Sequence, residues 1–490
     1  MILDSSHFLP YMQVKNDHFF IFLTMSNFYI LLHLKGGLNV AIRGFHHCVA
    51  VLFDFRTAFA VYIEVIMKNR IKSLFGFAFV LVIGFTNCTK SEFLIEISNS
   101  HIKREYAEIP NLDGFLTLKG DFHIHTVFSD GEATPEERVD EAILDGLDII
   151  AITDHIEYWV WVDEKFGKLR RDLGLPERSF SLNLSYEIAQ RYVNKISSDL
   201  IVIRGAEIAP DDMNPEIGHF NVLFLDDVDK LRYTNFWNPT EAQKIRYKYS
   251  YMDALRAAKA QGAFILFNHP GHATDNVSRE NDVLWNSEHE MLFEQGFIQG
   301  VELYGWGYFP MAHHYAIEKN LTLFGNTDIH DKMEVYKQLW WMDGWIGKQQ
   351  HRPMTLVFAR ERSVEAIREA LFERRTLVYL HQYLIGEEKY LKEIFEKSVE
   401  ITLIKTENEV EIILKNYSNL SFNIRIDIGN LNYYFQPRYL LQPRETQTIT
   451  HKINNVMDVD SVNFIIDNLI NTPTDVFPTV NKGITYTLEF

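Results

Sequence analysis

The sequence predicts a parallel α/β domain followed by a small antiparallel β-sandwich domain. Between residues 116 and 330, short apolar runs alternate with amphipathic helical patterns, which is typical of parallel α/β folds. In the last hundred residues, apolar and polar side chains alternate in short runs separated by Asn, Asp, Gly and Pro, which is typical of antiparallel sheets. We therefore expect the first domain over residues 116–380 and the second, accessory domain over 395–490.

Apolar runs give the expected strands of the first domain, in order: 118–125, 147–155, 200–208, 219–225, 263–269, 300–304 and 321–328. Helices are expected between several of them. The first begins at Pro135, after Thr134 as the N-cap, and others cover about 182–198, 240–261 and 311–319. A β-α-β-like segment follows over 356–380. The expected strands of the second domain are 401–403, 410–414, 422–428, 446–453 and 484–490.

The composition excludes several classes of protein. The chain of 490 residues has 48 basic and 66 acidic residues and a net charge of −18, whereas a nucleic-acid binder needs a basic face. We therefore expect no stable nucleic-acid complex, although a phosphorylated substrate is compatible if metal ions supply positive charge. The two cysteines, Cys48 and Cys88, exclude a disulfide scaffold and a multi-cysteine zinc site.

A signal peptide of the lipoprotein type is predicted at residues 67–88, inside the chain. Lys68, Arg70 and Lys72 precede an uncharged apolar run at 74–85, which is too short to span a bilayer comfortably, and Cys88 follows. Asn87 stands where a lipoprotein signal usually has a small residue. The prediction is a protein exported to the bacterial cell envelope and anchored by lipid at Cys88. The alternative for this segment is a buried hydrophobic helix.

A signal peptide works only at the start of a chain, so the preceding residues need an explanation. We expect translation to begin at Met67, with residues 1–66 an over-extended reading frame and residues 89–115 a polar tether. The alternative is a membrane segment at residues 18–34, which is uncharged. A peptide from before Met67, found by mass spectrometry of the native N-terminus, would contradict the first explanation.

Histidines and acids mark the ends of most expected strands. The first run ends in His123-Ile124-His125, with Asp130 in the next turn, and the third run ends at Glu207. Other such ends carry Thr153-Asp154-His155, Asn268-His269 and Thr327-Asp328-Ile329-His330, while the fourth run begins with His219. The carboxyl ends of parallel strands share one face of the fold, so these side chains are expected to converge there.

Packing alone does not explain this pattern, because an apolar core excludes unpaired charge. A set of satisfied core histidines is the alternative. Imidazole nitrogens and carboxylate oxygens without a thiolate are the ligand set of zinc, manganese or iron in multinuclear hydrolytic sites. The sequence therefore predicts a cluster of divalent metal ions.

These motifs resemble those of the PHP (polymerase and histidinol phosphatase) family over about residues 118–335. The motifs are DFHIHTVFSDGEATPEE, AITDHIEY, IRGAEI, GHFNVLFL, FNHPG and GNTDIH, and their details are most similar to the phosphodiesterase branch. The resemblance implies a distorted (β/α)7 barrel with a trinuclear metal cluster. The implied metal ligands are His123, His125, Asp130, His155, Glu207, His219, His269, Asp328 and His330.

The expected reaction is hydrolysis of a small phosphate ester, with a phosphodiester favoured over a monoester. Divalent ions lower the pKa of a bound water, and the resulting hydroxide attacks phosphorus in line. Glu207 is expected to bridge two metals because a carboxylate offers two ligand atoms. Asp154 is a candidate acid, an orienting group for His155 or a structural residue. The alternatives are a phosphomonoesterase, an exonuclease, or a non-catalytic surface protein whose metals only stabilise it.

Other polar and aromatic residues are expected to stand outside the chemistry. Glu157, His272 and Arg279 are expected at the surface near the mouth of the site. Solvated or packed roles are expected for His313, His314, His351, His381 and His451. Two loops carry aromatic clusters that could line a substrate pocket or pack against other loops; these are Tyr158, Trp159 and Trp161, and Trp340, Trp341 and Trp345.

Overall fold

The structure is a computed structural model that describes two units of the chain separately, Met1–His101 and Ile102–Phe490. In the first unit it describes residues 11–15, 18–25, 28–34, 38–44 and 53–54. In the second it describes residues 108–157, 181–209, 217–231, 250–270, 285–304, 308–335, 351–380, 382–428, 437–452, 460–473 and 483–489.

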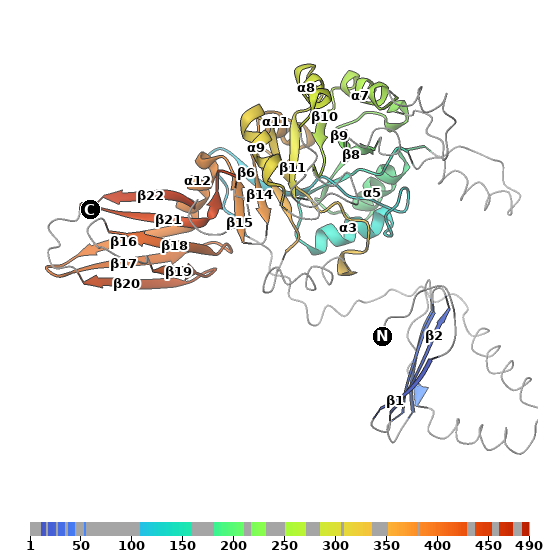
Figure 1. Cartoon of the computed structure of the whole chain (residues 1–490), viewed down its shortest axis with the longest axis horizontal. Coiled ribbons are helices and arrows are strands. Elements are labelled where there is room, and N and C mark those ends of the chain that lie inside the picture. Colours follow the sequence, from blue (N-terminus) through green and yellow to red (C-terminus); the bar gives the residue numbers. More distant parts are fainter. Residues whose placement is uncertain are drawn as a thin grey trace, which may run out of the picture. The chain divides into compact units, whose positions relative to one another are not determined.

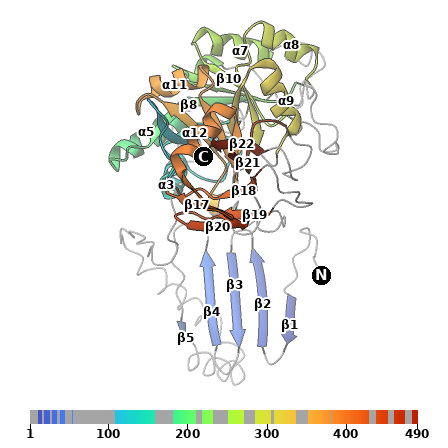
Figure 2. The same cartoon turned by 90° about the vertical axis from the view of Figure 1, so that its left-hand side faces the viewer.

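The first unit contains an antiparallel sheet with the strand order β1-β2-β3-β4-β5 (Figure 2). Its strands are β1 (Tyr11–Lys15), β2 (His18–Met25), β3 (Phe28–Leu34), β4 (Leu38–Gly44) and β5 (Phe53–Asp54). The alternative membrane segment at residues 18–34 therefore corresponds to two strands. None of the helices in the described part of the chain has the length and apolar character needed to cross a bilayer. Residues 67–88, the predicted signal peptide, lie outside the described residues.

The second unit begins with the predicted α/β domain, whose strands lie in the order β12-β11-β10-β9-β8-β7-β6-β13-β14-β15 (Figure 1). The first seven expected strands are all present: β6 (Leu116–Asp121), β7 (Ile149–Ile152), β8 (Ile201–Ile208), β9 (Phe220–Leu223), β10 (Phe264–Phe267), β11 (Gly300–Tyr304) and β12 (Thr322–Gly325). Most are shorter than their apolar runs because the polar motif residues lie just beyond the strand ends. The fold is therefore mixed α/β, as expected.

Not every strand in this sheet is parallel. Strand β9 is antiparallel to both β8 and β10, and β13 (Met354–Ala359) is antiparallel to β6 and β14 (Thr376–Leu380). The segment 356–380 thus contains the expected strand, helix and strand, but its two strands are antiparallel neighbours. The reversal of β9 also explains why its run begins, rather than ends, with a histidine.

Helices cover the outer faces of this sheet. Helix α3 (Pro135–Leu144) and helix α5 (Leu184–Lys195) pack with Ile150, Ile152 and Val202 in one apolar core. Helices α7 (Ser250–Ala260), α8 (Ser287–Glu294) and α9 (Pro310–Lys319) pack in a second core, and α11 (Val364–Phe372) in a third. The predicted capping of α3 is confirmed, because Thr134 and Glu137 form a reciprocal capping box. Helix α8 is an element that the sequence patterns missed.

The first and last parallel strands meet without a continuous ladder. Within the described residues, the segments that follow β6 and β12 share one isolated parallel bridge, Ile124 with Ile329, and the His125 N–H donates to the Ile329 carbonyl at 3.1 Å. We call this contact between residues 121–132 and 326–333 the seam. The structure supports a mixed α/β sheet in which the segment after its edge strand β12 approaches the segment after the interior strand β6, and the closed seven-stranded barrel stays a prediction.

The last hundred residues form two groups of antiparallel strands. Strands β18 (Phe422–Asp427), β19 (Arg438–Leu441), β21 (Ser461–Ile470) and β22 (Gly483–Glu489) continue the large sheet from β15 (Tyr383–Gly386), after which helix α12 (Glu388–Ser398) follows in the chain. Strands β16 (Val399–Lys405), β17 (Glu409–Asn416) and β20 (Thr446–Lys452) form a separate sheet. Buried and less buried residues alternate along β17, β18 and β21, and both groups contribute to one apolar core. This pattern favours the predicted sandwich.

Candidate metal centre

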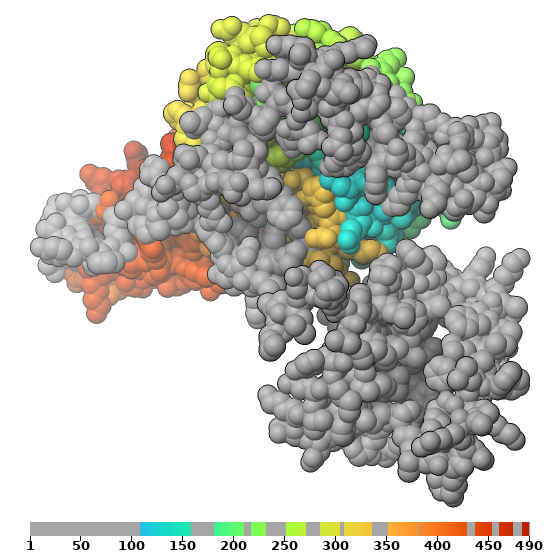
Figure 3. Space-filling view, turned by 45° about the vertical axis from the view of Figure 1, so that its right-hand side comes forward, coloured from blue at the N-terminus to red at the C-terminus, as the bar shows by residue number. Residues whose placement is uncertain are grey.

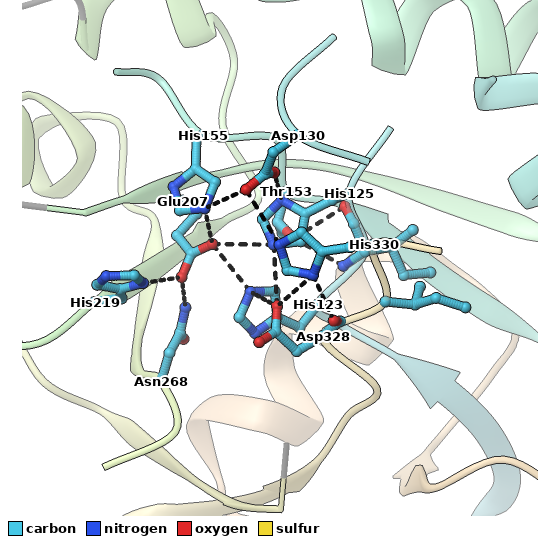
Figure 4. Close-up of polar contacts among 12 residues, drawn as sticks. His123, His125, Asp130, Thr153, His155, Glu207, His219, Asn268, Asp328 and His330 are labelled. Carbon is cyan, nitrogen blue, oxygen red and sulfur yellow. Dashed lines mark hydrogen bonds and ion pairs between the residues drawn. The ribbon is translucent and has the colours of Figure 1, made fainter. Parts of the chain in front are cut away.

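Six segments at one end of the sheet carry the candidate ligands to one place (Figure 4). His123, His125 and Asp130 follow β6, His155 follows β7, and Asp328 and His330 follow β12. Glu207 lies near the end of β8, while His269 follows β10. His219 precedes β9, and because β9 is antiparallel, its start lies at the same end of the sheet.

Glu207 is the central carboxylate of this cluster and is fully buried. Its Oε2 lies 3.1 Å from Nε2 of His123, 3.1 Å from Nε2 of His125 and 3.3 Å from Nε2 of His155. Its Oε1 lies 3.0 Å from Nδ1 of His219 and 3.5 Å from Nε2 of His269. The two oxygens of one carboxylate therefore face two different sets of imidazole nitrogens.

Asp328 faces the same imidazoles from across the seam. Its Oδ1 lies 3.1 Å from Nε2 of both His123 and His125, and its Oδ2 lies 3.9 Å from Nε2 of His269. Three histidines thus lie between Glu207 and Asp328, and both acids are at most 5% exposed.

Asp130 and His330 form the more exposed side of the cluster. Oδ2 of Asp130 lies 3.3 Å from Nε2 of His330 and 3.7 Å from Nε2 of His155, while its Oδ1 lies 3.4 Å from Nδ1 of His125. Their side chains are 33% and 28% exposed, respectively, whereas that of His123 is inaccessible. Solvent therefore reaches the cluster from this side.

The spacing of these atoms fits divalent cations. Donor atoms that share a tetrahedral zinc ion lie about 3.4 Å apart, given bond lengths of about 2.1 Å. The three nitrogens around Oε2 of Glu207 match this spacing. Overlapping groups of possible ligands follow from the geometry: His125, Asp130, His155 and His330; His123, His125, Glu207 and Asp328; and His155, Glu207 and His219.

The charges of the cluster keep its carboxylates in the ionised form. Burial would raise the pKa of Glu207, but the imidazoles of His155, His123 and His219 hold this pKa well below its usual value. Burial would likewise raise the pKa of Asp328, but the imidazoles of His123, His125 and His269 hold this pKa well below its usual value. For His155, burial lowers the pKa, but Glu207 and its acidic neighbours raise the pKa to about 9. Ionised carboxylates are the form that binds cations.

The backbone of the cluster adopts unusual conformations. His269 and Asp328 have positive φ angles of 22° and 51°, which L-residues rarely adopt. Gly131 lies against His125, and a Cβ atom at this glycine would be 2.6 Å from the His125 carbonyl carbon and oxygen. Strained or crowded backbone of this kind concentrates at functional sites.

Two buried residues that the sequence patterns missed support the ligands. Glu302, in the middle of β11, accepts hydrogen bonds from Nδ1 of His123 at 2.9 Å and from the His269 N–H at 2.8 Å. Asn268 donates to Oε1 of Glu207 at 2.8 Å. Their signal in the sequence was weak, although a glutamate in the otherwise apolar run VELY is unusual for a buried strand.

Other candidate residues have contacts that define their roles. The Asp154 carboxylate accepts hydrogen bonds from the Thr126 N–H at 2.7 Å and from the Ser129 hydroxyl at 2.8 Å, which favours a structural role in the loop that carries Asp130. Glu157 is buried, accepts from the Ala209 N–H at 2.9 Å and lies 3.7 Å from Nδ1 of His155. The expectation that Glu157 lies at the surface was therefore wrong.

Histidines expected outside the site lie outside it where they are described. On α9, His313 is buried and His314 is exposed. The His351 ring stacks on Tyr379, and His451 is buried in β20. The remaining residues in question lie outside the described residues: His272, Arg279, His381, Tyr158, Trp159, Trp161, Trp340, Trp341 and Trp345.

Comparison with known proteins places this geometry in a family. The model of the PHP domain matches residues 121–285. A solved two-domain protein from Bacteroides vulgatus ATCC 8482, described as containing a predicted PHP-like metal-dependent phosphoesterase, is 34% identical in sequence. The match covers 79% of this chain and 99% of that chain, with a TM-score of 0.64. The chain belongs to the PHP family.

Two more distant structures are also similar to this PHP protein. They are a putative metal-dependent phosphoesterase from Bifidobacterium adolescentis ATCC 15703 and an amidohydrolase from Chromobacterium violaceum, at 18% and 15% identity. Each match covers 44% of this chain and 88% of that chain, and the TM-scores of 0.29 and 0.27 are too low to bear on function. No curated protein matches the chain.

The PHP match contains seven of the candidate ligands and ends before Asp328 and His330. The structure nevertheless brings these two residues into the same cluster, because the segment after β12 lies beside the segment after β6. The structure brings all nine expected ligands to one place, with Nε2 of His269 at 3.5 Å from Glu207 and 3.9 Å from Asp328.

Proposed function

We propose that this PHP protein is a metal-dependent phosphoesterase that hydrolyses phosphodiester bonds. The observation that carries the proposal is the buried Glu207 carboxylate, whose two oxygens face separate sets of imidazole nitrogens. Such an arrangement suits a carboxylate that bridges two cations, and neighbouring cations are the basis of metal-assisted hydrolysis of phosphate esters.

The proposed centre holds three divalent cations, which zinc, manganese or iron would suit. The three groups of possible ligands overlap at His125, His155 and Glu207. If each imidazole binds one cation, the overlap resolves in one natural way. His123, His125, Glu207 and Asp328 bind the first cation; Asp130, His155 and His330 bind the second; and Glu207, His219 and His269 bind the third.

The residues around the centre would position the substrate and the cations. Bound cations would activate a water molecule and offset negative charge on the phosphate. The more exposed side of the cluster, with Asp130 and His330, is the side from which a phosphate ester would approach. Asp154 would hold the loop that carries Asp130 through Thr126 and Ser129, and Glu157 would orient His155.

The preference for diesters rests on the motif details at VFSDG, DHIEY, GHFNV and NHPGH. A side-by-side assay of a bis-aryl phosphate and an aryl monophosphate, each with Mn²⁺ or Zn²⁺, tests this preference. Faster cleavage of the diester is expected, and faster cleavage of the monoester would favour the phosphomonoesterase alternative. If EDTA lowers the melting temperature but neither ester is ever hydrolysed, the metals only stabilise a binding protein.

The location of the protein is a separate proposal. We propose export to the cell envelope with a lipid on Cys88, supported by the basic residues at 68–72 and the apolar run at 74–85. Substitution of Cys88 by Ala is expected to move the protein from the membrane fraction to the soluble fraction of the envelope. An unchanged membrane fraction would contradict lipid anchoring.

A further inference from the structure

The proposed metal centre spans the seam of the sheet. His123, His125 and Asp130 belong to one side of the seam, and Asp328 and His330 belong to the other. In the described part of the chain, the segments after β6 and β12 share one isolated bridge, Ile124–Ile329, so no continuous main-chain ladder holds these ligands together. Other interactions must therefore fix the distance between the two sides.

Arg138, on helix α3, makes several of these interactions with a single side chain. It is 1% exposed and uses all five of its N–H groups. On one side of the seam, its Nε donates to the His125 carbonyl at 2.8 Å. On the other side, Nη2 donates to the carbonyls of Ile329 at 3.3 Å and His330 at 2.7 Å, and Nη1 donates to the Asp331 carbonyl at 2.9 Å.

Glu141 completes the arrangement one turn later on α3. Its Oε2 accepts the fifth hydrogen bond of Arg138, at 2.8 Å, and its Oε1 accepts from the Met333 N–H at 2.8 Å. A surface ion pair joins the same segments, because Nζ of Lys332 lies 2.7 Å from Oε1 of Glu137. The two segments, cyan and gold, lie side by side on the surface in Figure 3. Helix α3 thus holds the segment after β12 at several points.

The residues of that segment do not depend equally on Arg138. Thr327 donates to Asp121 at 2.6 Å and Asn326 donates to Glu302 at 2.7 Å, so the two residues before Asp328 are held by hydrogen bonds that do not involve Arg138. The carbonyls of residues 329–331 all accept from Arg138, and those of Ile329 and His330 also accept from the His125 and Glu132 amides. His330 is therefore the ligand whose position depends most on this guanidinium.

We propose that Arg138 is a positioning residue that holds His330 against His125 across the seam and so completes the cation site of Asp130, His155 and His330. The proposal rests on the proposed metal centre. The ligands Glu207, His219 and His269 come from β8–β10 and do not cross the seam. Loss of Arg138 should therefore weaken one cation site selectively.

Cation content per chain tests the proposal. The variant Arg138→Met removes the guanidinium's hydrogen bonds to four carbonyls, and we expect it to lose one cation of three after dialysis, by elemental analysis. Arg375→Met is the matched control, because Arg375 is also buried and donates to a carbonyl, that of Phe358 at 3.1 Å. Phe358 pairs with Thr117 at the start of β6, away from the metal residues, so the control should lose stability but keep all its cations.

A conservative variant and a second measurement keep the test decisive if Arg138→Met does not fold. The ammonium group of Arg138→Lys cannot reach all four carbonyls in the planar geometry of a guanidinium, so we expect at least tenfold weaker binding of one cation. In the metal-free protein, hydrogen exchange of the His125 and Glu132 amides, which donate across the seam to Ile329 and His330, should accelerate in this variant but not in Arg375→Met.

The outcomes separate this inference from the proposed function. A wild-type protein that binds no divalent cation would overturn the proposed function itself. A wild-type protein that binds cations, with an Arg138→Lys variant of equal affinity and equal amide exchange, would overturn only the role of Arg138. Equal loss of all cations in the variants of Arg138 and Arg375 would also overturn it, because the effect would then be general instability.

Discussion

The His123 ring donates through Nδ1 to the Glu302 carboxylate at 2.9 Å, and its other nitrogen faces Glu207 at 3.1 Å. A neutral imidazole that donates from Nδ1 presents the lone pair of Nε2 in the opposite direction. Glu302 therefore selects the tautomer of His123 that can bind a cation beside Glu207. Buried acids behind metal-binding histidines commonly set ring orientation and ligand strength.

Substitution of Glu302 should weaken cation binding without removing a ligand. Glu302→Ala leaves the His123 ring without its acceptor, and we expect about 10–100-fold weaker metal affinity by titration of the metal-free protein. The metal affinity of Glu302→Gln should lie between those of the wild type and Glu302→Ala, since an amide oxygen can still accept from His123. Glu318→Ala, an exposed acid on α9, is the control; an effect as large as that of Glu302→Ala would contradict the specific role.

The proposed bridging role of Glu207 predicts a difference in metal content between two variants. Glu207→Gln removes the charge whose two oxygens face two sets of imidazoles, so it should lose at least two cations per chain. His219→Ala should lose one, because its Nδ1 faces one of the two oxygens of Glu207, Oε1. The exposed His314→Ala should lose none. Equal metal content in Glu207→Gln and His219→Ala would argue against the bridge.

Gly131 should be intolerant of any side chain. A Cβ atom would lie 2.6 Å from the His125 carbonyl, so Gly131→Ala must displace His125 and should lower both metal affinity and the free energy of unfolding, the latter by about 1–3 kcal/mol. Gly483→Ala is at least as crowded, because its Cβ would meet the Ile466 carbonyl oxygen, but Gly483 lies in the C-terminal sheet. That variant should lose stability and keep normal metal affinity, as measured by urea unfolding and metal titration.

Buried His313 should make the protein sensitive to acid. Burial lowers the pKa of His313 to about 4 from its usual 6.5, so the unfolded chain binds this proton more readily than the folded chain. Between pH 6.5 and 4 this group should therefore reduce the free energy of unfolding, by about 3 kcal/mol in full. Urea unfolding across this range should show that the free energy of unfolding falls less steeply with decreasing pH in His313→Phe than in the wild type. In the exposed His314→Phe, this dependence on pH should be unchanged. Identical slopes in wild type and His313→Phe would contradict the prediction.

The strand-end motifs predicted the metal cluster because ligand chemistry requires particular side chains at particular places. His123, Glu207 and Asp328 could be placed at strand ends from the apolar runs alone. In the structure, Nε2 of His123 lies 3.1 Å from an oxygen of Glu207 and 3.1 Å from an oxygen of Asp328. The direction of β9 could not be read from its composition, since buried parallel and antiparallel strands share the same apolar character. The position of His219 before its run was the one available signal.

The supporting residues were harder to predict because their partners are distant in the chain. Glu302 lies 179 residues from His123, and the Arg138 contacts reach about 190 residues along the chain to Ile329 and Asp331. In the sequence, Arg138 is one more charged position on an amphipathic helix, and such positions are usually solvated. Strand β21 was missed although Val462, Phe464 and Ile466 alternate with polar residues.

Strand β15 joins the metal-bearing sheet to the C-terminal region, since Leu384 and Ile385 pair in parallel with Leu469 and Ile470 of β21. A chain shortened before β21 would present a bare row of amides and carbonyls along Tyr383–Gly386, open to any extended peptide that met it. The C-terminal region thus shields the molecule against self-association. Truncation to isolate the metal-bearing part would therefore give an insoluble protein because of this exposed sheet edge, although every candidate metal ligand would still be present.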